Sequence, residues 1–240
     1  MNQLTDKFNI EQISKKIKDD IDLQNAYLSD SYFYNSLTFC VIDSVFSIGV
    51  RYSSVLNTVN NYAEFFKLKK HRLRTLDGYP NIQDQELLSD LIKNIDSLSI
   101  DFFTENIFKN KQRTSTRSGI LKTEATYKFA MVLYENSINS FDDIERLYKN
   151  SKVIKKGIEQ IPGQKSGISF DYFLMLSGNK NLIKPDRMIT RYLERITNLK
   201  LSQDDLLLIL EQSSNFLQKE FKDINPRILD HEIWKHERSK

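Results

Sequence analysis

Glycine, proline and cysteine are all scarce in this chain. Its 240 residues include seven glycines and four prolines, too few for an all-β fold with many tight turns, so long helices are favoured. The single cysteine, Cys40, excludes an internal disulfide and any zinc or iron–sulfur site that needs four cysteine ligands. Cys40 lies in an apolar run and is expected to be a core residue.

Long apolar runs are missing as well. No stretch approaches the roughly 18 uninterrupted apolar residues that suit a membrane-spanning helix. The amino-terminal segment also lacks the apolar run of a signal peptide. The sequence therefore predicts no membrane association and a reducing, cytoplasmic location, on the nucleoid if the source is a bacterium.

Neither sign of charge dominates the chain. The formal net charge is +3, which does not by itself indicate a nucleic-acid partner. The basic residues are unevenly distributed, however: the segment 109–128 holds six of them against one acid, and the segment 152–195 holds nine against four. A basic side that faces a polyanion and an ordinary solvated helical surface both fit this pattern.

Helical periodicity is what the chain has in abundance. Apolar residues recur at helical spacing along most of it, which predicts an all-α fold. The expected helices cover 8–30, 32–48, 52–68, 84–95, 99–109, 120–135, 151–160, 168–176, 187–196, 203–221 and a last one from Pro226. The segment 32–48 is almost wholly apolar and is expected to be a central, buried helix.

A glycine-bearing turn separates two of these helices. It reads Ile161-Pro162-Gly163-Gln164-Lys165-Ser166-Gly167. Backbone N–H groups at the start of the second helix, together with the helix dipole, favour a phosphate. Lys165 and Ser166 add a charge and a hydroxyl donor. A plain helix–turn–helix connection, with glycine for tight packing, is the alternative.

This turn, the apolar helix after it and the following Lys184-Pro185-Asp186 resemble the helix-hairpin-helix DNA glycosylase superfamily. In that family a leucine-proline-glycine-x-glycine hairpin joins two helices, and an aspartate opens the next helix. Gly163 and Asp186 are 23 positions apart, which fits. Upstream, Phe39–Tyr52 resembles the family's first core helix and its loop, and 120–125 resembles the lysine-containing helix before the hairpin. The resemblance covers roughly residues 36–200.

The resemblance implies a two-lobed, all-α bundle that acts as a monomer. The chain 1–240 would be one unit of this kind. Lobe A would comprise about 36–50 and 84–178, including the hairpin 161–167, and lobe B the N-terminal helix and about 184–240. The lobes are expected to face each other across a cleft that admits a flipped nucleotide.

The implied function is base excision without a cofactor or metal. The partner would be double-stranded DNA that contains a modified or damaged base. The carboxylate of Asp186 would stabilise the positive charge of an oxocarbenium-like state and can activate a water. A simple helix N-cap is the alternative role for Asp186, and both roles can hold at once. Gly167 stands where strand-cleaving members carry a lysine, which implies a monofunctional enzyme.

Further contacts follow from the same resemblance. The expected DNA-binding residues are Gly163, Gln164, Lys165, Ser166, Gly167, Lys184, Arg187, Arg113, Arg117 and Lys122. Lys165 replaces the second hairpin glycine, at a cost of about 1 kcal/mol if that position has a positive φ. Gly49 stands where some members carry a polar residue that fills the gap left by the flipped base. The base pocket or wedge therefore includes Ile48, Gly49, Arg51 and Tyr52, without a choice among them.

Two other functions remain open at this point. A glycosylase-like fold can bind DNA without chemistry, and Lys165 in the hairpin favours that possibility. A helical scaffold can also serve only protein interactions, because fold does not dictate function. The sequence does not identify the base, and alkylated, deaminated, oxidised and bulky modified bases are all candidates.

Overall fold

The computed structural model describes residues 7–73, 78–116, 118–178, 183 and 185–240. Over these residues the secondary structure is helical, with two isolated backbone bridges and no β-strand, so the all-α prediction is confirmed. The chain divides into two compact units. We call Ser29–Gly178 the central unit, and Met1–Leu28 together with Asn179–Lys240 the terminal unit. Residues 51–83, which the sequence assigned to neither lobe, belong to the central unit.

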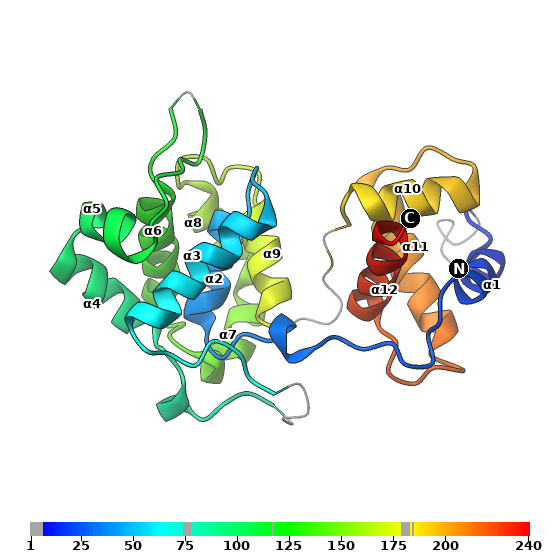
Figure 1. The fold of residues 1–240 in the computed structure, drawn as a ribbon, viewed down its shortest axis with the longest axis horizontal. Helices are drawn as coiled ribbons and strands as arrows, with labels where there is room; N and C mark the ends of the chain where they lie inside the picture. The colour runs from blue at the N-terminus through cyan, green and yellow to red at the C-terminus, as the bar shows by residue number, and fades with distance from the viewer. Residues whose placement is uncertain (1–6, 74–77, 117, 179–182, 184) are drawn as a thin grey trace. The chain divides into compact units, whose positions relative to one another are not determined.

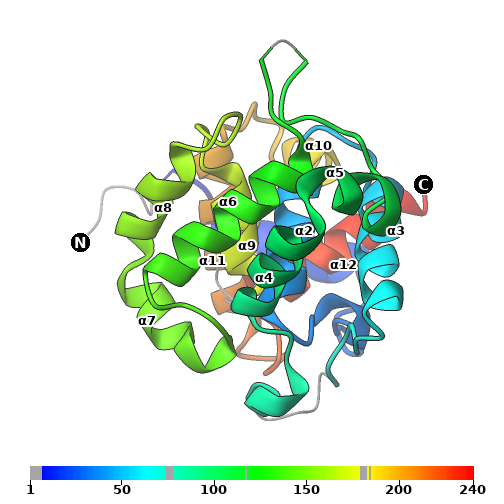
Figure 2. The ribbon, with the colours of Figure 1, turned by 90° about the vertical axis from the view of Figure 1, so that its left-hand side faces the viewer.

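The central unit is built around one buried helix, α2. All ten residues of α2 (Leu37–Phe46) are buried, as expected for the apolar segment 32–48. Four helices, α3 (Tyr52–Phe65), α4 (Leu88–Leu98), α6 (Lys122–Glu135) and α9 (Ile168–Leu176), pack against it (Figure 1), and Figure 2 shows α4 and α6 crossing in front of it. The other helices are α5 (Ile100–Phe102), α7 (Ile144–Lys149) and α8 (Ser151–Glu159). Short turns are η1 (Asp30–Tyr32), η2 (Ile82–Asp84), the π-helical η3 (Phe103–Ile107) and η4 (Phe141–Asp143).

Aromatic side chains fill the core of the central unit. The Tyr62 ring lies 5.9 Å from that of Phe39 and 5.8 Å from that of Phe108, centroid to centroid. A second group joins Phe129 of α6 to Phe173 of α9, with centroids 5.4 Å apart in an edge-to-face arrangement. Such rings bury large apolar areas and prefer tilted contacts. They fix α2, α3, α6 and α9 as a rigid scaffold for the surface loops.

The terminal unit has four helices and a largely aliphatic core. The helices are α1 (Ile10–Asp20), α10 (Arg187–Thr197), α11 (Gln203–Leu217) and α12 (Pro226–Arg238). Ser202 and Asp205 form a capping box at the start of α11, and the Asn225 side chain caps α12. These caps satisfy amide groups that have no partner inside the helix. Apolar side chains from all four helices meet in one core: Ile17, Leu193, Ile209, Leu229 and Ile233.

Two helices are shorter than predicted, for local reasons. The helix expected over 8–30 ends at Asp20, where Ile21 becomes extended and the Asp22 carboxylate accepts a hydrogen bond from the Gln24 amide at 3.0 Å. Such a turn competes with the helix for the backbone. The helix expected over 32–48 begins at Leu37, because residues 33–35 pair with 70–72 through backbone hydrogen bonds of 2.9 Å.

Candidate functional site

The turn between α8 and α9, residues 160–167, consists of two successive tight bends. The Gln164 amide donates to the Ile161 carbonyl and the Gly167 amide to the Gln164 carbonyl, each at 2.9 Å. The positive φ angles in the turn belong to Gly163 (+85°) and Gly167 (+70°). Lys165 has no positive φ, so the strain that a lysine there was expected to cause does not arise.

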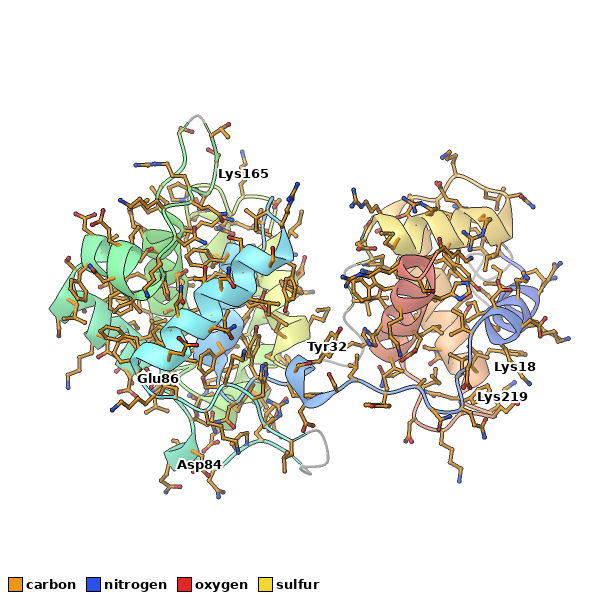
Figure 3. All side chains as sticks on the ribbon, viewed as in Figure 1. Lys18, Tyr32, Asp84, Glu86, Lys165 and Lys219 are labelled. Carbon is orange, nitrogen blue, oxygen red and sulfur yellow. The ribbon has the colours of Figure 1, made fainter. Side chains whose placement is uncertain are left out.

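Part of this turn is presented to solvent. Lys165 and Ser166 are exposed, whereas Gln164 and Gly167 are buried. The Lys165 side chain points away from the helices (Figure 3), and it makes no ion pair within the part of the chain that the structure describes. Among those residues the backbone amides of Lys165 and Ser166 also find no acceptor. The turn thus offers a cation and backbone donors together.

Packing also requires glycine at position 163, whereas at Gly167 an added Cβ atom would meet only the flexible ends of side chains. A Cβ atom added to Gly163 would lie 2.4 Å from the Thr114 Cβ atom, and one added to Gly167 would lie 2.4 Å from the Lys155 Cε atom. Because Gly163 combines a positive φ with this close approach, it places the 110–121 loop directly against the turn. At Gly163 the structure thus agrees with the alternative in which glycine serves tight packing between protein segments.

The 110–121 loop, which we call the basic loop, is described at residues 110–116 and 118–121. Backbone hydrogen bonds close its base, from the Thr114 amide to the Ile120 carbonyl at 2.9 Å and from the Lys122 amide to the Gln112 carbonyl at 2.8 Å. Arg113 is exposed and donates to the Gly119 carbonyl at 2.8 Å. Arg117, another predicted DNA contact, lies outside the described residues.

Lys122 was predicted to contact DNA, but the structure buries it. Its side chain is 2% exposed, and Nζ donates to the carbonyl oxygens of Phe46 and Ile48 at 2.9 and 2.8 Å. A third contact reaches the Gln112 side-chain oxygen at 3.4 Å. Burial lowers the pKa of Lys122 to about 8. A buried ammonium with its donors already used cannot bind a phosphate; instead it ties the end of α2 to the basic loop.

The predicted base pocket or wedge lies at the surface between α2 and α3. Ile48 is partly exposed, and Gly49 and Arg51 are exposed. Gly49 has a φ of +70° with open space around it. Tyr52, the first residue of α3, is 49% exposed. The structure places these four side by side without distinguishing a wedge among them.

A buried carboxylate beneath this loop was missed by the sequence reasoning. Asp43 of α2 is fully buried. It accepts hydrogen bonds from the hydroxyls of Tyr34 and Ser47, both at 2.6 Å, and from Tyr52 at 3.4 Å. Burial, with the adjacent Asp43 charge, raises the pKa of Tyr52. Asp43 thereby fixes the half-exposed Tyr52 ring; its only signal in the sequence was one acid inside an apolar run.

Three surface segments of the central unit are thus connected. Lys122 joins the α2–α3 loop to the basic loop, and Thr114 packs the basic loop against Gly163 of the 160–167 turn. All three lie at the same end of the unit (Figure 1). Among the described residues their exposed cations are Arg51, Arg113, Lys165 and Lys111, and Lys111 is paired with Glu105. One surface therefore combines basic side chains, free amides and an exposed aromatic ring.

Asp186 belongs to the terminal unit, where it caps α10. Its Oδ1 atom accepts hydrogen bonds from the Met188 and Ile189 amides at 2.7 and 3.3 Å. Asp186 is exposed, and Oδ2 has no donor among the described residues. One carboxylate oxygen is therefore fixed by the helix and the other remains open to a ligand. A cap of this kind holds the side chain in a single orientation.

Arg187 and Arg191 form an exposed basic pair on α10 of the terminal unit. They lie one helical turn apart, both are exposed, and neither has an ion-pair partner within the described chain. They line a shallow hollow together with Thr190 and Lys200. Arg187 was predicted from the sequence, whereas Arg191 was not, although the spacing of four residues was visible. Lys184, also predicted, falls outside the described residues.

Fold and site first define a class: an all-helical protein of two units, with an exposed cationic surface on one and a capped, open carboxylate on the other. The chain belongs to the family described as a domain of unknown function, DUF8548, whose model matches residues 11–238. No curated protein and no solved structure matches the chain. Within the described residues, no helix is long and apolar enough to cross a membrane.

Proposed function

We propose that this protein is a monofunctional DNA glycosylase of the helix-hairpin-helix type, which hydrolyses the N-glycosidic bond of a modified or damaged base in double-stranded DNA. One observation carries the proposal. A glycine-bearing turn between two helices presents a cation and free amides, and 23 positions after Gly163 a fixed carboxylate opens a further helix. This combination suits phosphate binding and cation stabilisation in one protein.

The central unit binds the DNA backbone in this proposal. Lys165 and Arg113 contribute positive charge, and the Lys165 and Ser166 amides contribute hydrogen-bond donors to phosphate oxygens. Such contacts position a protein on the duplex without reading its sequence. Tyr52, half-exposed and held by Asp43, offers an aromatic face against which a base can stack.

Asp186 acts on the sugar. As the bond between C1′ and the base nitrogen breaks, the nitrogen takes the electron pair and positive charge develops on C1′ and the ring oxygen. The anionic Asp186, with Oδ1 fixed by two amides and Oδ2 open, stabilises this charge. Water then bonds to C1′ and releases a proton, which leaves an abasic site and the free base.

The product should be an uncut strand. Strand-cleaving members of the helix-hairpin-helix glycosylase superfamily use a lysine at the position that Gly167 occupies in this chain. Gly167 is buried. Without an amine at this position no Schiff base forms there. Borohydride should therefore trap no covalent protein–DNA adduct.

The test is a panel of duplexes that each contain one alkylated, deaminated, oxidised or bulky base. Treatment with the protein and then with hot alkali, which cuts abasic sites, should yield strand breaks for at least one duplex. Asp186→Asn should abolish the breaks, whereas Asp204→Asn, at an exposed acid in the first turn of α11, should retain them. Breaks that persist in Asp186→Asn, or their absence from the whole panel, would contradict the proposal.

Non-catalytic DNA binding is the second candidate. It is favoured by the cap itself, because Asp186 already has a structural role that would explain its presence. The same panel separates the two functions. Salt-sensitive binding to duplexes without any base release would support this second function and reject the first.

A further inference from the structure

The solvent-facing side of α10 lines a shallow hollow on the terminal unit. The buried residues of this helix, Ile189, Tyr192 and Leu193, lie on its other side. The lining positions recur every three or four residues, as one face of a helix does, and the loop 198–200 completes the hollow. The lining residues from the helix itself are Arg187, Thr190, Arg191, Glu194 and Arg195. With Lys200 of the loop, the hollow has four cations and one acid.

The acid of the hollow and two of its cations are already used within the terminal unit. The Glu194 carboxylate accepts hydrogen bonds from Lys200 Nζ at 3.1 Å and from the Leu201 amide at 3.2 Å. Arg195 donates two hydrogen bonds to Glu237 of α12, a residue that is 4% exposed. These groups therefore hold the unit together and leave no acid of the hollow for the remaining two cations.

Those two cations are Arg187 and Arg191. Both are exposed, and neither makes an ion pair within the described chain. They are four positions apart, about 6 Å along the helix axis, and like charges at this spacing destabilise a helix. Arg187 is also in the first turn, where the helix dipole disfavours a cation. The stability of α10 does not account for this pair, which suits an anion from outside the chain.

A second hollow of the terminal unit gives the contrast. It lies beside α1 and the last residues of α10. Its Lys15 pairs with Glu11 and its Lys16 with Asp20, each at 2.7 Å. Its other lysines have acid partners too. That surface neutralises its own charges, whereas the hollow on α10 leaves two guanidinium groups without a counter-charge.

We propose that the hollow on α10 binds the phosphate backbone of the DNA strand on which Asp186 acts, with Arg187 and Arg191 on neighbouring phosphates. A planar guanidinium group binds a phosphate through two parallel hydrogen bonds. A strand carries one phosphate per nucleotide, so a row of cations along a helix matches a row of anions along the strand.

This inference rests on the proposed function, in which Asp186 acts on the sugar. Asp186 immediately precedes Arg187, and the Thr190 hydroxyl of the hollow donates to the Asp186 carbonyl oxygen at 3.0 Å. The open carboxylate oxygen and the two free cations therefore belong to the same end of one helix. A strand held along α10 is held beside the carboxylate that the proposed chemistry needs.

The first test measures binding of the full chain to a short unmodified duplex over a range of salt concentrations. Arg187→Gln combined with Arg191→Gln should weaken binding by about tenfold or more. The slope of log affinity against log salt should fall by about 1.8, because two phosphate contacts are lost. Arg187→Lys combined with Arg191→Lys keeps both charges and should keep this slope. Lys15→Gln removes a paired, exposed cation of the same unit and should bind like the wild type.

Urea midpoints show whether each variant is folded. An unchanged salt slope in a folded double-glutamine variant would overturn the inference, and so would an equal loss in Lys15→Gln. Replacement of chloride by phosphate at constant ionic strength should leave duplex binding unchanged. A loss of binding in phosphate would assign the hollow to a free phosphate compound and reject DNA. None of these measurements needs base release, so a failure of the proposed function appears separately, as a panel without strand breaks.

The second test locates the contact on the duplex that the panel identifies. Single phosphates around the modified base are replaced, one at a time, by neutral methylphosphonates. Two neighbouring replacements on the strand of the modified base should weaken binding of the wild type. The same two should not affect the double-glutamine variant, because its contacts to them are already lost. A variant as sensitive as the wild type at every position would contradict the assignment of Arg187 and Arg191 to this strand.

Discussion

Two ionisable groups, one in each unit, differ in the sign of their charge and in how their buried atoms are satisfied. In the central unit, the Lys122 ammonium has three oxygen acceptors, two of them backbone carbonyls at the end of α2. In the terminal unit, the buried Asp230 oxygen has no donor. A satisfied buried charge joins structural elements, whereas an unsatisfied one retains a proton. Both groups have displaced pKa values, but in opposite directions: the pKa of Lys122 is lowered and that of Asp230 is raised.

The pH dependence of stability should therefore have opposite signs in the two units. The folded pKa of Asp230, about 7, lies above its ordinary value of 3.8, so its contribution is full below pH 4 and is lost as the pH rises through 7. The folded pKa of Lys122, about 8, lies below 10.5, so its contribution is full above pH 10.5 and is lost as the pH falls through 8. At 1.36 kcal/mol per pKa unit, each contribution amounts to at most about 4 kcal/mol.

Paired urea titrations check this contrast. Trp234 fluorescence of wild type against Asp230→Asn reports on the terminal unit. Circular dichroism at 222 nm follows the helices of both units, and the difference between wild type and Lys122→Met isolates the contribution of Lys122. Each variant should abolish the pH dependence of stability that its own residue causes and should leave that of the other residue unchanged. The assignment of the two pH dependences to Asp230 and Lys122 would be contradicted if they had the same sign, or if either one persisted in the variant that removes its residue.

Removal of the Lys122 ammonium should itself destabilise the central unit. Lys122→Met keeps an unbranched chain of similar length but leaves the carbonyls of Phe46 and Ile48 without their donor. A lost hydrogen bond to a charged group with an orphaned partner costs about 3 kcal/mol. Lys128→Met, at an exposed position of the same helix, is the matched control and should change the urea midpoint little. Equal effects of the two variants would mean that the Lys122 contacts do not stabilise the fold.

Glycine substitutions separate backbone strain from packing. Gly49 and Gly163 both have a positive φ, but only at Gly163 does an added Cβ atom meet another side chain, that of Thr114. Gly49→Ala should cost about 1 kcal/mol, and Gly163→Ala about 2 kcal/mol or more, measured by urea unfolding. In the double variant Gly163→Ala with Thr114→Ser, the extra cost relative to Gly49→Ala should persist, because serine keeps the Cβ atom of residue 114. Equal costs at the two glycines would place the basic loop away from the turn.

Neutralising exposed cations should have the smallest effects, on DNA binding alone. Lys165→Gln, Arg113→Gln and Arg187→Gln should each weaken binding to all duplexes alike. Each should also reduce the slope of log affinity against log salt by about 0.9 for the lost phosphate contact. Lys122→Gln should leave this slope unchanged, since Lys122 is buried. Salt-independent binding, or full binding by the triple variant, would exclude the proposed surface.

The sequence predicted the helices well and the polar interior poorly. The periodic apolar face of α10 located that helix, and nearly continuous apolar runs located α2 and α9. The cap at Asp186 followed from the position of an acid before a periodic segment. Helix ends such as Asp20 depended on one side-chain hydrogen bond and on pairing between distant segments, which a local pattern does not contain.

The candidate site was predictable in part, for the same reason. The 160–167 turn and Asp186 are local motifs, so spacing identified them. Lys122 was expected at the surface from its charge, but its burial depends on the carbonyls of Phe46 and Ile48, more than seventy positions away in the chain. Asp43 gave only a weak local signal, one acid inside an apolar run, and Asp230 gave none, because tertiary packing alone buries the Asp43 side chain and the Asp230 Oδ1 atom.

The central claim is that Asp186 supplies the negative charge for base excision. The most direct test is the single-turnover rate of base release by wild type and Asp186→Asn, on the duplex that the panel identifies. Asparagine still caps α10, so the urea midpoint and DNA affinity should be close to those of the wild type. The rate should fall by roughly 10²–10⁴-fold, the range expected for one such group. An unchanged rate in a folded, DNA-binding Asp186→Asn protein would show that Asp186 is only a helix cap.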